Sequence, residues 1–367
     1  MRFFLVICVA ALFMIGIVTI FSTTSAEVLD HDLDRSFSYA VLKQLYYGLT
    51  GLILGGIVWK VGYRRFLQYS PALLYFSLFL LILTLIPGIG REVNGSRRWL
   101  ALMGFSFQPS EFVKYVVPAY FIHRFLILDE LPWTFWKFLR LISLPLLAVL
   151  LILVEPNNGT AAVVGITMLL LCLLMRLPAK YWAFPLIGFS LLGAVFASQL
   201  PYVTARLNVY LHPELDIRGK GHQPHQAKIA AGSGGMLGRG PGNSLQKLSY
   251  LPEAQNDYIA AIYAEEFGFI GVIILLALYA AIAYIGFHAA LHAVDRAGFY
   301  FGGAILFLIC FQAFLNLGVV SGLLPSTGLN LPFFSQGGSS LMANLAGISF
   351  LLQLIREDPM RWVNSEC

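Results

Sequence analysis

Long apolar runs recur along nearly the whole chain, and each is about as long as a helix that crosses a bilayer. The first extends from Phe3 to Phe21, and runs of about 18 to 22 residues follow it. Hydrophobic residues make up 58% of the chain and charged residues 12%, which is about half the charge content of a soluble domain. A soluble globule would expose this apolar surface to water, and a disordered chain would lack it. We therefore predict a polytopic membrane protein.

Apolar runs and helix breakers together predict an all-α membrane protein with ten transmembrane helices in a single domain, residues 1–367. The predicted spans are 3–22, 38–58, 70–87, 110–128, 139–154, 159–175, 182–200, 258–287, 299–321 and 339–355. The first run is longer than the core of a typical signal peptide, so we interpret it as an uncleaved span. Because ten is even, both termini are expected on the same side.

Basic residues in the short loops predict the orientation. When the N-terminus is placed in the cytoplasm, the cytoplasmic loops hold most of these residues, including Arg64, Arg65 and Arg124. The positive-inside rule therefore predicts that both termini are cytoplasmic. A large extracytoplasmic loop, about 201–257, then connects helices 7 and 8.

Two outer loops are basic against this trend. Loop 88–109 carries Arg97 and Arg98 beside Trp99, and the large loop carries Arg206 and Lys247. A solvated basic surface is one interpretation, since long loops cross the membrane whatever their charge. We favour binding of a lipid-linked phosphate, because these cations lie beside the outer leaflet and suit such an anion.

The large loop also contains a glycine-rich segment, residues 232–242. It lacks the Gly-Lys-Ser/Thr ending of a P-loop and the βαβ context of a dinucleotide site. A flexible linker is one interpretation; the interleaved Leu237 and Arg239 favour backbone packed against a ligand or another segment. His222 and His225 have no third ligand at a recognisable spacing, so no metal site is expected there.

Charged residues inside the predicted spans are candidates for function. Lys114 lies about one turn inside the fourth span, with Glu111 three residues before it on the same helix face. Glu155 ends the fifth span, and we expect that it can pair with Lys114. A structural salt bridge is the alternative for Glu111, but an intramembrane lysine needs a partner or a wet cavity and is a functional candidate.

Asp257 precedes the eighth span and has two interpretations. It can cap the helix N-terminus, or it can be a catalytic carboxylate. Helical spacing would place Asp257, Ala261 and Glu265 on one face, with two carboxylates along one wall. The uncharged loop 322–340 is rich in helix breakers, and such loops survive at membrane depth when they line a cavity or are buried in protein. Its polar candidates are Gln336, Ser339 and Ser340.

Six segments of this chain resemble, in order and spacing, the motifs of the shape, elongation, division and sporulation (SEDS) family. They are Gly95-Ser-Arg-Arg-Trp99, Gln108-Pro-Ser-Glu-Phe-Val-Lys114, Glu155-Pro-Asn-Asn-Gly-Thr160, Gly232-Ser-Gly-Gly235, Leu251-Pro-Glu-Ala-Gln-Asn-Asp257 and Phe334-Ser-Gln-Gly-Gly-Ser-Ser340. The resemblance covers essentially the whole chain. Leu251-Pro-Glu-Ala254 is more similar to the division branch (FtsW type) than to the elongation branch (RodA type).

The resemblance implies a peptidoglycan glycosyltransferase that polymerises lipid II, a disaccharide peptide on undecaprenyl diphosphate, at the outer face of the cytoplasmic membrane. For the division branch it implies a location at the septum. It implies a class B penicillin-binding protein, a transpeptidase, as partner, together with other division proteins and membrane lipid; no nucleic acid is expected. No tightly bound cofactor is expected, and a divalent cation stays open. Where the family usually has Glu-Pro-Asp, Asn157 removes one acidic ligand.

The resemblance also assigns roles to residues. The family's essential aspartate matches Asp257, which we expect to act as the general base on the attacking sugar hydroxyl. Cations would stabilise the diphosphate leaving group, and one displacement with inversion is expected. The candidate substrate-binding residues are Arg97, Arg98, Trp99, Glu111, Lys114, Glu155, Arg206, Gln226, Lys247, Gln336, Ser339 and Ser340.

Three other functions remain open from the sequence. In a lipid II flippase, the intramembrane charges would line a transport path and Asp257 would only gate it. A scaffold that recruits division proteins would have little use for buried charges. A RodA-type polymerase for elongation would use the same chemistry elsewhere in the wall.

Overall fold

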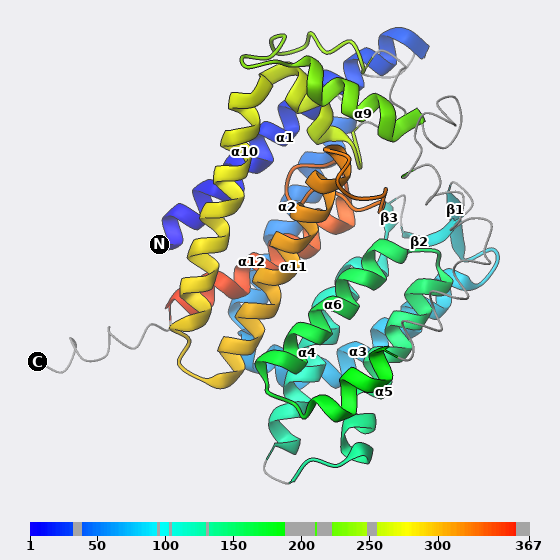
Figure 1. Ribbon diagram of the computed structural model, residues 1–367. Helices are drawn as coiled ribbons and strands as arrows, with labels where there is room; N and C mark the ends of the chain where they lie inside the picture. Colours follow the sequence, from blue (N-terminus) through cyan, green and yellow to red (C-terminus); the bar gives the residue numbers. More distant parts are fainter. Residues whose placement is uncertain are drawn as a thin grey trace, which may run out of the picture.

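The computed structural model describes residues 1–31, 39–93, 96–102, 105–129, 132–187, 210, 222–247 and 255–356. These residues form a helical bundle with one small sheet (Figure 1). The helices are α1 (Arg2–His31), α2 (Tyr39–Val61), α3 (Tyr63–Leu85), α4 (Pro109–Leu128), α5 (Phe135–Val154), α6 (Asn158–Leu174), α9 (His222–Ser233), α10 (Ile259–Leu291), α11 (Arg296–Val320) and α12 (Gly338–Arg356). The strands are β1 (Gly90–Val93), β2 (Ser96–Leu102) and β3 (Phe105–Phe107).

The bundle is that of a polytopic membrane protein. Seven of the described helices, α1, α2, α3, α5, α10, α11 and α12, are long and apolar enough to cross a membrane. Large hydrophobic side chains such as Phe3, Leu52 and Tyr284 point outward, as expected for surfaces that face lipid. The predicted fold class is confirmed. The number of ten spans and the orientation stay predictions, and most of the predicted span 182–200 lies outside the described residues.

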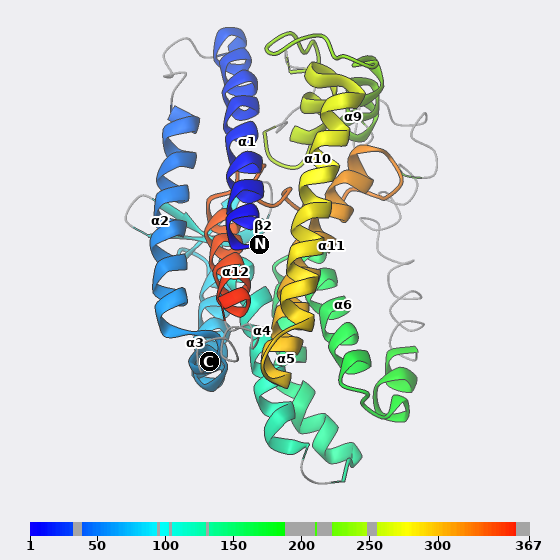
Figure 2. The same cartoon turned by 90° about the vertical axis from the view of Figure 1, so that its left-hand side faces the viewer.

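Helices α4 and α11 lie inside the bundle, where other helices cover them (Figure 2). Helix α4 packs against α3, α5, α6, α11 and α12, and α11 packs against α10 as well. A helix surrounded by protein can carry polar side chains that would be costly against lipid. The buried Glu111 and Lys114 of α4 and the buried Gln312 and Asn316 of α11 are such residues.

The segment 88–109, predicted as a loop, contains the small sheet. The strands are antiparallel in the order β1-β2-β3, with Arg91 opposite Trp99 and Leu100 opposite Phe107. The strands are short and interrupted by turns, so their sequence lacks a clear period-two pattern. Their pairing satisfies the backbone and holds Arg98 and Trp99 in defined positions.

Helix α3 begins seven residues before the predicted span. Its first turn is polar, so a search for apolar runs does not include that turn. Tyr63 is its first residue, and the predicted span starts at residue 70. In this turn the Arg64 Nε donates to Asp295 Oδ2 at 2.9 Å. Asp295 is the N-cap of α11, and its side chain accepts from the backbone N–H of Gly298. This contact joins α3 to α11 at the end of α11 opposite Asn316.

Candidate active site

A cavity of about 980 Å³ opens between the sheet, the central helices and the turn before α10. It receives side chains from segments that are far apart in sequence. The lining of the cavity includes Lys43, Arg91, Arg98, Trp99, Glu111, Asn157, Gln255, Asp257, Asn330, Gln336, Ser339 and Ser340. Seven of these, Arg98, Trp99, Glu111, Asp257, Gln336, Ser339 and Ser340, are candidates from the sequence, and the fold brings them to one place.

Asp257 belongs to the turn that precedes α10. The N-cap of α10 is Tyr258 and the helix begins at Ile259, so the capping interpretation of Asp257 is wrong. The backbone of the turn is held from two sides, since Gln336 N–H donates to the Gln255 carbonyl at 3.0 Å. The Asn316 side-chain amide donates to the Asp257 carbonyl at 2.8 Å. The carboxylate lines the cavity.

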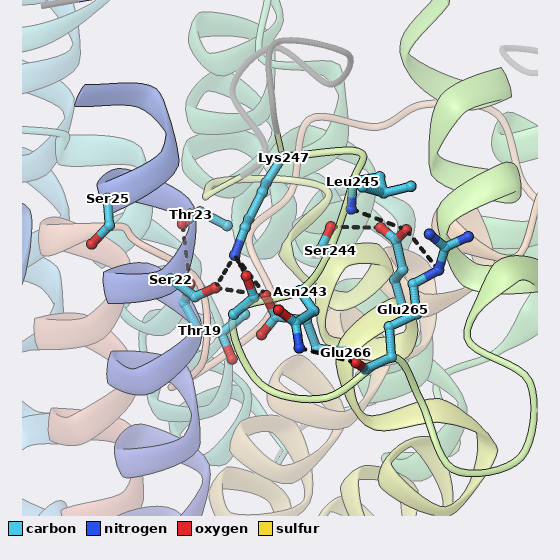
Figure 3. A network of polar contacts seen from close by, with 12 residues as sticks. Thr19, Ser22, Thr23, Ser25, Asn243, Ser244, Leu245, Lys247, Glu265 and Glu266 are labelled. Atoms are coloured by element: carbon cyan, nitrogen blue, oxygen red, sulfur yellow. Dashed lines mark hydrogen bonds and ion pairs between the residues drawn. The ribbon is translucent and has the colours of Figure 1, made fainter. Parts of the chain in front are cut away.

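Glu265 does not share a wall with Asp257, which corrects the prediction of two carboxylates on one face. Asp257 lies outside the helix, so helical spacing does not apply to it. The fully buried Glu265 carboxylate instead accepts a hydrogen bond from Ser244 Oγ at 2.5 Å (Figure 3). It accepts another from Ser233 Oγ at 3.2 Å. It also accepts from the backbone N–H groups of Leu245 and Gln246. Its role is to hold the segment that follows the glycine-rich stretch.

The glycine-rich segment packs against α10, as the second of its two interpretations predicted. Arg239 N–H donates to the Glu265 carbonyl, and Gly240 N–H donates to the Glu266 carbonyl, both at 3.0 Å. At Gly238, where φ is +81°, an added Cβ would lie 2.2 Å from the Glu266 carbonyl oxygen. Only glycine permits this approach of two backbones.

Lys247 belongs to the same structural contact and is not among the residues that line the cavity. Its Nζ donates to Glu266 Oε1 at 3.1 Å and to Ser22 Oγ at 2.8 Å (Figure 3). The pair is almost fully buried and joins the large loop to α1 and α10. The structure therefore gives Lys247 an ion-pair partner in place of the predicted substrate contact.

Lys114 lies behind the cavity wall. Its Nζ donates to Glu111 Oε2 at 2.7 Å and to Gln312 Oε1 at 2.8 Å. Glu111 lines the cavity and Lys114 does not, so the predicted direct contact of Lys114 with a diphosphate is not what this arrangement offers. The structural salt bridge considered for Glu111 is confirmed.

Glu155 is not the partner of Lys114, contrary to the prediction. Its side chain is fully buried and accepts a hydrogen bond from Thr84 Oγ1. Glu155 follows the last residue of α5, and burial raises the pKa of its carboxyl, opposed by the hydrogen bond from Thr84. Its side chain does not line the cavity, whereas its neighbours Pro156 and Asn157 do.

Arg98 reaches across from β2 to the turn between α5 and α6. Its Nε donates to the Glu155 carbonyl at 3.0 Å, and its Nη2 donates to the Pro156 carbonyl at 2.5 Å. Its guanidinium also lies 6.0 Å from the centre of the Trp99 ring. Arg97 points elsewhere and pairs with Glu92 at 3.0 Å on the surface, so only Arg98 of the two neighbours reaches the cavity.

Two cations of the cavity were not candidates from the sequence. Lys43 on α2 and Arg91 on β1 line it together with Arg98. Both looked like ordinary interfacial charges, and the only available signal was their position in outer loops or at a helix end. Gln226 does not line the cavity, and Arg206 lies outside the described residues.

The loop before α12 and the first turn of α12 form another part of the cavity wall. Gln336, Ser339 and Ser340 line it, as predicted for an uncharged loop at membrane depth. Ser339 Oγ also accepts from the backbone N–H of Gln108, which fixes the start of α4 against α12.

The cavity and the other described residues offer no evident set of metal ligands. Among the described residues there is no group of three or more His, Cys, Asp or Glu side chains that could hold a metal ion. Asn157, which replaces an acidic residue, caps α6 and donates to Ser110 Oγ at 3.1 Å. We therefore assign no chemical step to a metal ion.

Comparisons with known proteins identify the family of this chain. The cell cycle protein family that unites FtsW, RodA and SpoVE matches residues 2–359. Stage V sporulation protein E of Bacillus subtilis is 38% identical over 96% of both chains. A probable peptidoglycan glycosyltransferase FtsW of Saccharophagus degradans is 40% identical over 91% of this chain and 87% of its own.

Two solved structures share the fold over nearly the whole chain. A chain of a peptidoglycan synthase complex, described for its coordination of polymerization and crosslinking, superposes with a TM-score of 0.77 at 29% identity. That match covers 96% of this chain and 97% of the other. The rod shape determining protein RodA of Thermus thermophilus superposes with a TM-score of 0.70 at 28% identity and covers 96% of each chain. The matched length, the motifs and the fold together place this chain in the FtsW, RodA and SpoVE family of cell cycle proteins.

Proposed function

We propose that this chain is a peptidoglycan glycosyltransferase that polymerises lipid II during cell division. The observation that carries the proposal is a single cavity in which the carboxylate of Asp257 shares the lining with three cations, Lys43, Arg91 and Arg98. Relatives named as FtsW glycosyltransferases, with 34 to 40% identity, support the division assignment.

The reaction requires a base for the attacking hydroxyl and positive groups that stabilise the negative charge of the leaving diphosphate. The hydroxyl of one sugar attacks the anomeric carbon of another, and its proton passes to the Asp257 carboxylate. The new carbon–oxygen bond forms as the bond from the anomeric carbon to the diphosphate breaks, and the electron pair leaves with the diphosphate. Cations near the leaving group stabilise that charge. One displacement turns an α-linked diphosphate into a β-linked glycan, so no covalent enzyme intermediate is needed.

Polar side chains in the loop before α12 and in its first turn suit the sugars. Gln336, Ser339 and Ser340 offer donors and acceptors to hydroxyl and acetamido groups, and Trp99 offers a flat apolar face. We assign substrate binding to these residues together with Glu111 and Arg98.

The same cavity would also suit a lipid II flippase, which is the second candidate. A flippase needs polar groups along a path but no base, whereas a scaffold needs neither. The buried Lys114 forms an ion pair with Glu111 inside the bundle. A lysine held in this way is more suited to a structural role than to moving a substrate across the membrane, which favours the polymerase.

We further propose a class B penicillin-binding protein as partner, at the septum of the cytoplasmic membrane. The fold match to a chain of a complex that coordinates polymerization and crosslinking supports a crosslinking partner. The outward-facing apolar helices support a multi-pass membrane location.

Incubation of the purified chain with lipid II, with and without the transpeptidase, tests the function directly. We expect glycan polymer that is resolved as a ladder after digestion of the peptide stems. Lipid II translocation in vesicles without any polymer would instead identify a flippase.

Replacing Arg98 with alanine is expected to lower kcat/KM for lipid II by about ten- to a hundredfold, the effect of losing hydrogen bonds from a charged group. Arg98→Lys should recover only part, because an ammonium cannot keep both bonds to the turn while facing the substrate. The matched control is Arg97→Ala, which removes the neighbouring surface arginine. An equal loss in both variants would mean that general charge in this loop, and not the position of Arg98, is what matters.

A further inference from the structure

Two amide side chains on α11 are held against the walls of the cavity. Gln312 and Asn316 are four residues apart, so they lie on the same face of the helix, and both are buried. Gln312 Nε2 donates to the Asn330 carbonyl at 2.8 Å, and Asn316 Nδ2 donates to the neighbouring Leu329 carbonyl at 2.7 Å. The two amides thus anchor consecutive peptide groups of the loop before α12.

Asn316 makes one contact that Gln312 does not. Its Nδ2 also donates to the Asp257 carbonyl at 2.8 Å, so one amide nitrogen joins the Asp257 turn to the loop before α12. Its own Oδ1 is buried and has no hydrogen-bond partner in the described part of the chain. A buried acceptor without a partner costs stability and offsets part of what the two donated hydrogen bonds contribute. Asn316 is thus a side chain that joins the Asp257 turn to the loop before α12.

The surroundings of Asp257 explain why a backbone anchor matters. Asp257 lines the large cavity and also a second pocket of about 80 Å³, to which Asn316 and Gly328 contribute. Asp257 therefore contributes to both cavities, and the hydrogen bond from Asn316 fixes the backbone that carries its side chain. A general base must lie within hydrogen-bond reach of the proton it takes, so small displacements cost rate.

We propose that Asn316 is a positioning residue for Asp257: its amide holds the Asp257 turn in register with the loop before α12 and so aims the carboxylate at the attacking hydroxyl. The proposal rests on the proposed function, because it assumes that Asp257 is the base. Asn316 itself does not line the large cavity and does not touch the substrate there.

The test is steady-state polymerisation of lipid II by purified full-length variants, with thermal unfolding measured on the same samples. Asn316→Leu removes both donors, and Asn316→Asp keeps the shape but presents a carboxylate that cannot donate when ionised. We expect kcat to fall at least tenfold in both, with KM for lipid II within about twofold of wild type, because the misplaced group acts in the chemical step. Asn316→Leu should unfold at a lower temperature than the wild type, because it leaves the Asp257 and Leu329 carbonyls without this donor, and the control below measures the effect of a similar loss far from Asp257. If Asn316→Leu fails to fold, the result for Asn316→Asp decides.

The matched control is Gln353→Leu. Gln353 is another amide clamp on the backbone, with Oε1 accepting from Tyr63 N–H at 2.8 Å and Nε2 donating to the Trp59 carbonyl at 3.2 Å, far from Asp257. We expect a lower unfolding temperature and an unchanged kcat. If Gln353→Leu lowers kcat as much as Asn316→Leu does, the effect is general destabilisation and the proposal is overturned.

A double-mutant cycle separates this inference from the proposed function. In an Asp257→Glu background with residual activity, Asn316→Leu should reduce kcat much less than in wild type, since the carboxylate is already misplaced. Equal factors in the two backgrounds would overturn the positioning role. Substantial polymer from Asp257→Asn would overturn the proposed function itself, whereas inactive Asp257→Asn with wild-type kcat in Asn316→Leu would overturn only the inference.

Discussion

Replacing Asp257 with asparagine is expected to abolish glycan synthesis while the protein still inserts and folds. Asparagine keeps the size of the side chain but cannot accept a proton, and general-base catalysis contributes about 10²- to 10⁴-fold in rate. Because the N-cap of α10 is Tyr258, the substitution does not remove a helix cap. Lipid II polymerisation by the purified variant, beside its thermal unfolding, is the measurement.

Two further variants make this result specific. Asp257→Glu should retain little activity, because one extra methylene moves the carboxylate out of line with the attacking hydroxyl. Asp295→Asn is the matched control. Asp295 is the N-cap of α11, at the end of that helix away from Asn316, and asparagine caps about as well as aspartate. It should polymerise lipid II like the wild type. Normal polymer from Asp257→Asn would remove Asp257 from the chemistry.

The second large effect is expected on stability, from Glu265→Gln. The buried Glu265 carboxylate accepts from two serine hydroxyls and two backbone N–H groups, and Arg239 Nε lies 3.4 Å from its Oε1. An amide turns one acceptor into a donor that faces other donors. We expect the free energy of unfolding to fall by about 3 kcal/mol, the order found when one partner of a buried charged network is lost.

Thermal unfolding and limited proteolysis between residues 233 and 247 measure this effect. Glu92→Gln is the control, because the Glu92 pair with Arg97 is about half exposed and such pairs contribute about 0–1 kcal/mol. Proteolysis of Glu265→Gln at the wild-type rate would show that Glu265 does not hold this segment. A loss of polymerisation with unchanged stability would return Glu265 to the list of catalytic candidates.

Local pattern was sufficient for the membrane class and for most helices. A run of about 20 apolar residues has few alternatives to a membrane helix, because backbone groups in lipid must be satisfied within the segment. For the same reason, an uncharged loop rich in breakers at membrane depth pointed to a cavity, and Gln336, Ser339 and Ser340 do line one. The salt bridge between Glu111 and Lys114 also followed from spacing along one helix.

The sequence-based predictions were wrong for two buried carboxylates, Glu155 and Glu265, whose surroundings come from several segments of the chain. Glu155 was expected to neutralise Lys114, but Gln312 from α11 occupies that place and Thr84 binds Glu155. Glu265 was expected beside Asp257, but the chain turns before Ile259 and sends the two carboxylates to different surroundings. For Glu155 the partner came from another element, and for Asp257 the helix begins too late for helical spacing to apply.

The sequence by itself therefore determined the membrane class, most of the described helices and the residue types available for chemistry. Hydrophobic burial depends on composition and local period, so it can be read without knowing the neighbours. Only the tertiary structure decided that Lys43, Arg91 and Arg98 share one cavity with Asp257, while Arg97 and Lys247 pair elsewhere. Electrostatic and hydrogen-bond contacts act over a few ångströms between segments far apart in sequence, and their geometry exists only after the helices have packed.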